Sequence, residues 1–185
     1  ELSQIAGLGV IKDGVRMTEA FNEGVEYVFG ADEAPRVIEA IGAFIRSMPL
    51  ALLSAPGTER GVLCAHSVPG PDLINRFDER VLERDLTEDD YAPRRGAAHI
   101  MVWGRAHTPA LLDHLAQRWG TPLMLLGHEK APDGWMTVPD RALVLNSDHE
   151  RGAALRVDLS SPPAVPLALD APPEGLIPLG GGPGV

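Results

Sequence analysis

The stretch PLMLLGHEKAPDG, residues 122–134, contains four consecutive apolar residues between Pro122 and Gly127, followed directly by His128. So short an apolar run with proline and glycine at its ends is typical of a strand that is covered on both faces, although a buried helical turn also fits. A glycine before the histidine allows a sharp turn and a close approach of another group. We therefore predict a buried strand that places His128 at its end.

A second stretch has the same design. Residues 62–65 are apolar, and His66 follows them directly. Histidines at the ends of rigid strands can be held at the fixed separation that a metal ion demands. Each histidine alone is better explained as a hydrogen-bonded residue of the core or its rim; for the matched pair, metal ligation stands beside that explanation as an open alternative.

Composition limits the class of protein. A chain of 185 residues that is 44% hydrophobic can form one domain with a real core. The formal charge of −10, without a dense Lys/Arg cluster, argues against a nucleic-acid partner. No stretch has the roughly 20 apolar residues of a membrane span. The single Cys64 rules out an intrachain disulfide and suits a reducing compartment, so we expect a cytoplasmic protein.

The rest of the chain alternates predicted helices and strands, which indicates an α/β fold. Helical spacing of apolar residues predicts helices over 15–29, 35–48, 71–82 and 110–119. Strands are predicted over 50–53, 62–65, 100–103, 123–126, 135–138, 141–145 and 153–159. We expect one domain over residues 1–159. The Pro/Gly-rich residues 160–185 are predicted to be a linker or disordered tail.

Four motifs occur in the order found in a known family: LCAHSVPGPDL (63–73), MVWGRAHTP (101–109), LLGHEKAPDG (125–134) and ALVLNSDHERGAALRVDLS (142–160). In these motifs the chain resembles the C-terminal half of calcineurin-like metallophosphoesterases, in particular bacterial enzymes of the serine/threonine protein phosphatase type. The resemblance implies an α/β sandwich whose N-terminal half is missing, with a second sheet after His128. It also implies that His66 and His128 are metal ligands.

The same resemblance implies an activity. It is hydrolysis of phosphate esters, phosphoproteins among them, at a site that holds two divalent ions (Mn, Fe or Zn) when intact. Arg105 would contact the substrate phosphate, because a guanidinium matches phosphate oxygens; a surface arginine is the alternative. The family's Asp-x-His and Asn-His-Glu motifs do not occur in this sequence. We therefore expect the isolated chain to be catalytically inactive.

Two other readings remain open. Ser67 follows a predicted strand, as in the nucleophile elbow of an α/β-hydrolase, with His128 or His149 as its base. Pro69 argues against this serine esterase, since the elbow needs small residues around the serine. A noncatalytic binding or scaffold domain is the other alternative.

Overall fold

The structure is a computed structural model, which describes residues 11–12, 14–139, 141–163, 165, 167 and 171–180. The chain divides into two compact units. The first unit comprises Glu1–Pro49 and Asp78–His99, and the second comprises Leu50–Phe77 and Ile100–Val185.

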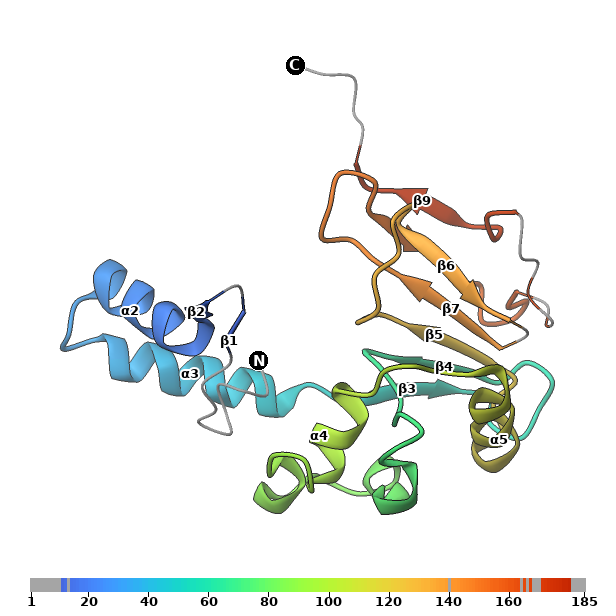
Figure 1. Ribbon diagram of the computed structural model, residues 1–185, viewed down its shortest axis with the longest axis horizontal. Helices are drawn as coiled ribbons and strands as arrows, with labels where there is room; N and C mark the ends of the chain where they lie inside the picture. The colour runs from blue at the N-terminus through green and yellow to red at the C-terminus, as the bar shows by residue number, and fades with distance from the viewer. Residues whose placement is uncertain are drawn as a thin grey trace. The chain divides into compact units, whose positions relative to one another are not determined.

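The first unit is mainly helical. Its elements are β1 (Ile11–Lys12), β2 (Val15–Arg16), α2 (Met17–Phe29), α3 (Ala34–Ser47), η2 (Glu79–Leu82) and η3 (Glu88–Tyr91). Helices α2 and α3 lie against each other and confirm the two helices predicted from apolar spacing (Figure 1). Pro35 lies in the first turn of α3, where a missing N–H costs no helical hydrogen bond. The residues buried within these two helices are Val25, Ala34 and Ile45.

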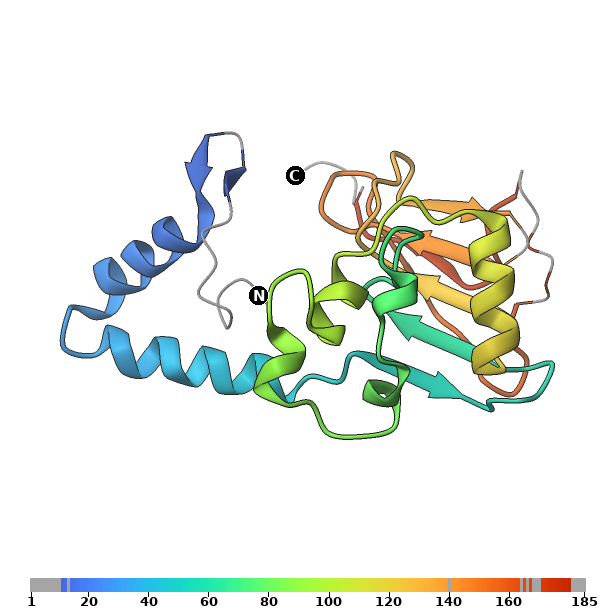
Figure 2. The same cartoon turned by 60° about the horizontal axis from the view of Figure 1, so that its bottom comes forward.

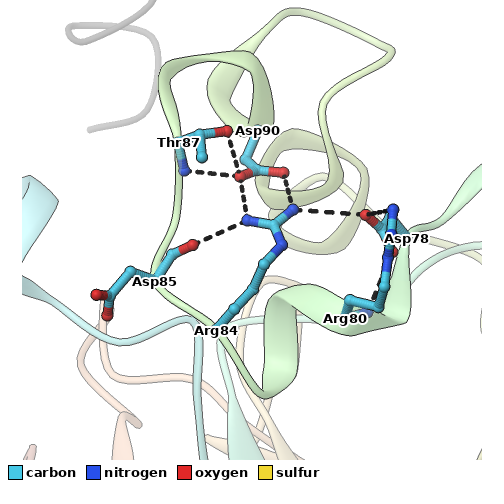
Figure 3. A network of polar contacts seen from close by, with 6 residues as sticks. All are labelled: Asp78, Arg80, Arg84, Asp85, Thr87 and Asp90. Carbon is cyan, nitrogen blue, oxygen red and sulfur yellow. Dashed lines mark hydrogen bonds and ion pairs between the residues drawn. The ribbon is translucent and has the colours of Figure 1, made fainter.

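A polar network organises the loops of the first unit (Figure 3). The Arg84 guanidinium donates to both carboxylate oxygens of Asp90 at 2.7 and 2.8 Å, and to Asp78 at 3.4 Å. The Thr87 amide and hydroxyl donate to the same Asp90 carboxylate. Asp90 is only 6% exposed. The polar run over residues 83–95 is typical in sequence of an exposed loop, and this prediction is wrong at Asp90.

The second unit is built on one mixed sheet of five strands. The strands are β3 (Ala51–Ser54), β4 (Val62–Ala65), β5 (Leu123–Leu126), β6 (Trp135–Val138) and β7 (Ala142–Leu145). Their order across the sheet is β3-β4-β5-β7-β6, as Figure 1 shows. The outer pairs β3/β4 and β7/β6 are antiparallel, while β4, β5 and β7 run parallel. The α/β class is confirmed, and the strands predicted over 50–53, 62–65, 135–138 and 141–145 form the two antiparallel pairs.

The two faces of this sheet are covered differently. Helix α5 (Pro109–Trp119) crosses one face (Figure 2), where Leu112 and Leu115 pack on residues of β4, β5 and β7. Thr108 caps this helix and accepts a hydrogen bond from the Leu111 amide at 3.2 Å. On the other face Leu167, from the C-terminal segment, packs against the sheet residues Leu125 and Leu143.

The remaining elements complete the unit and revise one prediction. They are η1 (Ile74–Arg76), β8 (Ala153–Leu155) and β9 (Leu176–Pro178), with α4 (Ala97–Val102) beginning in the first unit and ending in the second. The predicted helix over 71–82 is replaced by the short η1 and η2. None of the helices in the described ranges is long and apolar enough to cross a membrane.

Residues 100–103 do not form the predicted strand, because most of them belong to α4. Four of its six residues, Ala97, Ala98, Ile100 and Met101, are buried. A short apolar run fits a buried strand and a buried helical turn equally well, so its periodicity could not distinguish them.

The hairpin that follows His128 does not begin a second sheet, as the resemblance implied; the small second sheet of this unit is β8 paired with β9. Strand β7 pairs in parallel with β5 and brings β6 with it into the same sheet. The metallophosphoesterase type of sandwich is therefore not confirmed. The boundary at residue 159 stays a prediction, but β9 pairs with β8, so the described part of the tail contains a strand.

Candidate functional site

His66 and His128 meet at one end of the central sheet. Their strands β4 and β5 are parallel neighbours, with Ala65 paired to Leu126 at the last position of each. His66 follows β4 directly, and His128 follows β5 after one residue. Nε2 of His66 lies 2.7 Å from Nδ1 of His128, and the ring centroids are 4.6 Å apart. The predicted convergence of the two imidazoles is confirmed.

The turn that carries His128 differs from the expectation. A Cβ on Gly127 would meet His66 atoms only at 3.6 and 3.7 Å, an ordinary contact. His128 itself has the left-handed backbone, with φ of 66°. This conformation is uncommon for a residue with a side chain and often marks a functional position. The sharp turn is therefore made by the histidine and not by the glycine before it.

The electrostatic surroundings keep His128 neutral. Its pKa is lowered to about 4, mainly by burial and in addition by the positive charge of Arg105 and by the neighbouring His66. At neutral pH the ring therefore has a lone pair to offer. Nε2 of His128 is buried and has no hydrogen-bond partner. The ring of Trp103 lies edge-on to His128, with centroids 6.0 Å apart.

Arg105 reaches this site from the loop after α4, and not from the end of a strand. The loop is packed tightly on the segment after β4: a Cβ on Gly104 would overlap the Val68 carbonyl oxygen, and one on Gly70 would lie 2.7 Å from the Arg105 carbonyl oxygen. Ser67 donates to the Gly104 carbonyl at 2.8 Å. The Arg105 side chain is exposed, and its charge acts on His128.

His107 ties this loop to the segment after β4. Its side chain is 1% exposed. Its place between a predicted strand and helix suggested a helix-capping or solvent-exposed residue, which this burial contradicts. Its Nε2 lies 2.9 Å from the Val68 carbonyl oxygen and therefore donates a proton to it. Its Nδ1 is buried without a hydrogen-bond partner, 4.0 Å from Oε1 of Glu129.

Glu129 is a residue of this site that the sequence analysis did not single out. Its Oε1 accepts a hydrogen bond from the Ala106 amide at 3.1 Å. The one available signal was its place directly after His128, which could not reveal a partner 23 residues away.

The geometry does not support Ser67 as a nucleophile. Ser67 is only 1% exposed, and its hydroxyl donates to the Gly104 carbonyl. The nearest imidazole is His107, at 3.4 Å, whose Nε2 already carries the proton given to Val68. His149, the other histidine considered as a base, instead donates to the Ala131 carbonyl at 2.9 Å.

The site fits a metal ion in part. Two nitrogens bound to one zinc ion lie about 3.3 Å apart, so the two rings would have to separate by roughly half an ångström. The protein could reach that spacing by small side-chain rotations. Within the described ranges, no group of three or more His, Cys, Asp or Glu side chains could hold a metal ion. The pair therefore supplies two ligands of an incomplete set.

Comparisons with known proteins give a partial similarity. The chain is 30% identical over 116 residues to the pyruvate kinase of Corynebacterium efficiens and 31% identical over 116 residues to that of Corynebacterium glutamicum. Each match covers 62% of this chain and 24% of the relative, so the chain spans about a quarter of the length of these curated relatives. No family model matches the chain, and no solved structure matches it.

These findings correct the resemblance drawn from the four motifs. The relatives found are pyruvate kinases and not calcineurin-like metallophosphoesterases, so that assignment is wrong. The motifs were short apolar runs followed by histidine, glycine or proline, and such runs arise wherever buried strands end in turns. What the motifs did locate is the pair of histidines at the strand ends.

Proposed function

We propose that this chain contributes two imidazole ligands and a phosphate-binding arginine to a protein that hydrolyses phosphate esters with the help of a divalent metal. The supporting observation is the 2.7 Å approach of His66 and His128 at the ends of two adjacent parallel strands. Rigid strand ends hold ligands more accurately than loops do.

The chemistry of the residues is consistent with this role. A metal ligand must be a neutral imidazole, and the lowered pKa of His128 keeps it neutral at pH 7. When bound, a divalent metal polarises a phosphoryl oxygen and lowers the pKa of water. The Arg105 guanidinium offers paired N–H groups to phosphate oxygens and compensates their negative charge. The substrate class is a phosphorylated small molecule or phosphoprotein.

The first test is metal binding by the chain itself. We expect Zn²⁺ or Co²⁺ to bind with an affinity that falls more than about tenfold in His66→Ala and in His128→Ala, since even second-sphere partners contribute that much. Co²⁺ absorption would report nitrogen ligation directly. His114→Ala, at an exposed position of α5, is the matched control and should bind as the parent chain does. Equal affinities in all three variants would exclude the pair as ligands.

The second test is catalysis. Because the chain supplies only two metal ligands, it should not hydrolyse p-nitrophenyl phosphate by itself. In an active protein that contains this chain, Arg105→Lys should lose activity while keeping metal, because lysine cannot reproduce the guanidinium fork. Unchanged turnover in a metal-bound Arg105→Ala protein would contradict a phosphate contact.

A second candidate rests on the two relatives. Both are named pyruvate kinases, so phosphoryl transfer between a nucleotide and pyruvate is the competing activity. Arg105 would then contact the transferred phosphoryl group. A coupled assay for pyruvate formation, run beside p-nitrophenyl phosphate hydrolysis on the same preparation, separates the two. Nucleotide-dependent pyruvate formation without ester hydrolysis would favour this second candidate.

A further inference from the structure

The loop that carries Arg105 has a backbone that needs support. Ala106 has a φ of 59°, in the left-handed region that residues with a side chain rarely adopt. Gly104, two residues earlier, lies against the Val68 carbonyl with no room for a Cβ. An exposed arginine on a strained loop would lose its position unless neighbouring groups fixed the loop.

Two groups fix the loop from different sides. On one side Ser67 and His107 connect it to the segment after β4, through the Gly104 and Val68 carbonyls. On the other side Glu129 accepts the hydrogen bond of the Ala106 amide. The Ala106 amide belongs to the peptide bond that joins it to Arg105, so this hydrogen bond acts directly on the backbone of the arginine.

Glu129 also forms backbone hydrogen bonds in the turn that carries His128. Its amide donates to the Gly127 carbonyl at 2.7 Å, and its carbonyl accepts from the Asn146 side chain at 3.5 Å. Its side chain is 24% exposed. Because Glu129 follows His128 directly, one turn holds both the imidazole and the backbone of the Arg105 loop.

We infer that Glu129 is a positioning residue, which fixes Arg105 beside His66 and His128 by accepting the Ala106 N–H. This inference rests on the proposed function, since it assigns Arg105 a phosphate to hold. Glu129 does not touch the substrate; it acts through the loop. Its negative charge opposes phosphate binding, while its role as an acceptor favours it, and these two effects can be separated by substitution.

The test compares Glu129→Gln, which keeps an acceptor oxygen but removes the charge, with Glu129→Leu, which removes both. The probe is inorganic phosphate, titrated into the chain and followed by ¹H–¹⁵N NMR spectra. If Glu129 acts by position, Glu129→Gln should bind phosphate at least as well as the parent. Glu129→Leu should bind it about fivefold to tenfold more weakly, the loss typical of one hydrogen bond to a charged acceptor. If only its charge matters, both variants should bind more tightly, which would overturn the inference.

A double-mutant cycle with Arg105→Ala shows whether the effect passes through the arginine. With Arg105 absent, Glu129→Leu should not weaken phosphate binding further. An equal loss with and without Arg105 would overturn the inference. Glu129→Ala repeats the measurement if the leucine variant does not fold, as judged by the dispersed amide signals of β5.

Failure of the proposed function is recognised separately. If Arg105→Ala alone leaves phosphate affinity unchanged, the phosphate contact is wrong, and positioning is then decided by hydrogen exchange at the Ala106 amide. That exchange should accelerate about fivefold or more in Glu129→Leu and stay unchanged in Glu129→Gln, as expected for loss of one hydrogen bond. Equal exchange in the parent and both variants would overturn the positioning role.

Discussion

The Arg84 network of the first unit and the histidine site of the second are both built from charged and polar side chains, but they satisfy their hydrogen bonds to different extents. Asp90 receives donors on both carboxylate oxygens, from a guanidinium, a hydroxyl and an amide. In the described part of the chain, the buried side-chain nitrogens without a hydrogen-bond partner are His107 Nδ1 and His128 Nε2, and both lie in the histidine site.

The difference distinguishes polar groups that stabilise the fold from polar groups that are available to a ligand. A network that fully satisfies a buried carboxylate, as around Asp90, stabilises the loops that contribute to it. Buried nitrogens without partners, together with left-handed backbone at Ala106 and His128, cost stability and persist where a ligand or a reaction uses them. The predictions below test whether this contrast holds.

The largest effect is expected where the histidine site is packed most tightly. Gly104→Ala would force a methyl group into the Val68 carbonyl, and we expect a loss of about 3 kcal/mol in the free energy of unfolding. Gly127→Ala is the matched control, with room for the methyl group, and should change stability by less than about 0.5 kcal/mol. Urea unfolding measures both. Equal losses at the two glycines would show that the loop packing is not as described.

Disrupting the Arg84 network should have the next largest effect on stability. Asp90→Asn leaves Arg84 without its carboxylate, and we expect a loss of about 2 kcal/mol at neutral pH, since hydrogen bonds to charged groups contribute that much. The Arg84 guanidinium holds the pKa of Asp90 well below its ordinary value of 3.8. The folded state therefore binds fewer protons, and this stability is lost as pH falls below about 3.8.

The Asp90→Asn variant also tests this dependence of stability on pH. Stability measured from pH 6 to pH 2 should fall less steeply in Asp90→Asn than in the parent, because the titrating carboxylate is gone. Metal affinity at His66 and His128 should not change. An unaltered acid slope would mean that Asp90 is not stabilised by its partners.

The smallest effect at neutral pH is expected from His128→Gly. The substitution removes ring packing but relieves the left-handed backbone, so stability at pH 7 should stay within about 1 kcal/mol of the parent. The pKa of His128 is lowered from 6.5 to about 4, so the unfolded state takes up this proton first as pH falls. Its contribution is complete above about pH 6.5 and lost toward about pH 4; the glycine variant should lack that dependence. A loss of several kcal/mol at pH 7 would make His128 a structural residue.

The sequence predicted the parts of the molecule that depend on local pattern. Buried apolar runs with turn residues at their ends located β4 and β5, and hence the two histidines. Strand patterns over 135–138 and 141–145 located β6 and β7. Helical spacing over 110–119 located α5.

The sequence could not predict what depends on contacts between distant residues. The run over residues 100–103 fits helix and strand equally well, and tertiary burial decides for α4. Nothing local shows that β7 pairs with β5, or that Ala106 donates to Glu129. Arg105 was associated with the site through a family resemblance that the relatives found contradict, although its loop does bring its charge near His128.

The register of β4 and β5 has a consequence for how chains of this kind can vary in length. Residues can be gained or lost between the segment after β4 and the start of β5 without changing the pairing of Ala65 with Leu126. Between Leu126 and His128 there is no such freedom. One residue inserted there adds about 3.3 Å of chain, more than the 2.7 Å that separates the two ring nitrogens. In any relative that keeps this site, gaps in the alignment should therefore fall between the two histidine turns and never within the second.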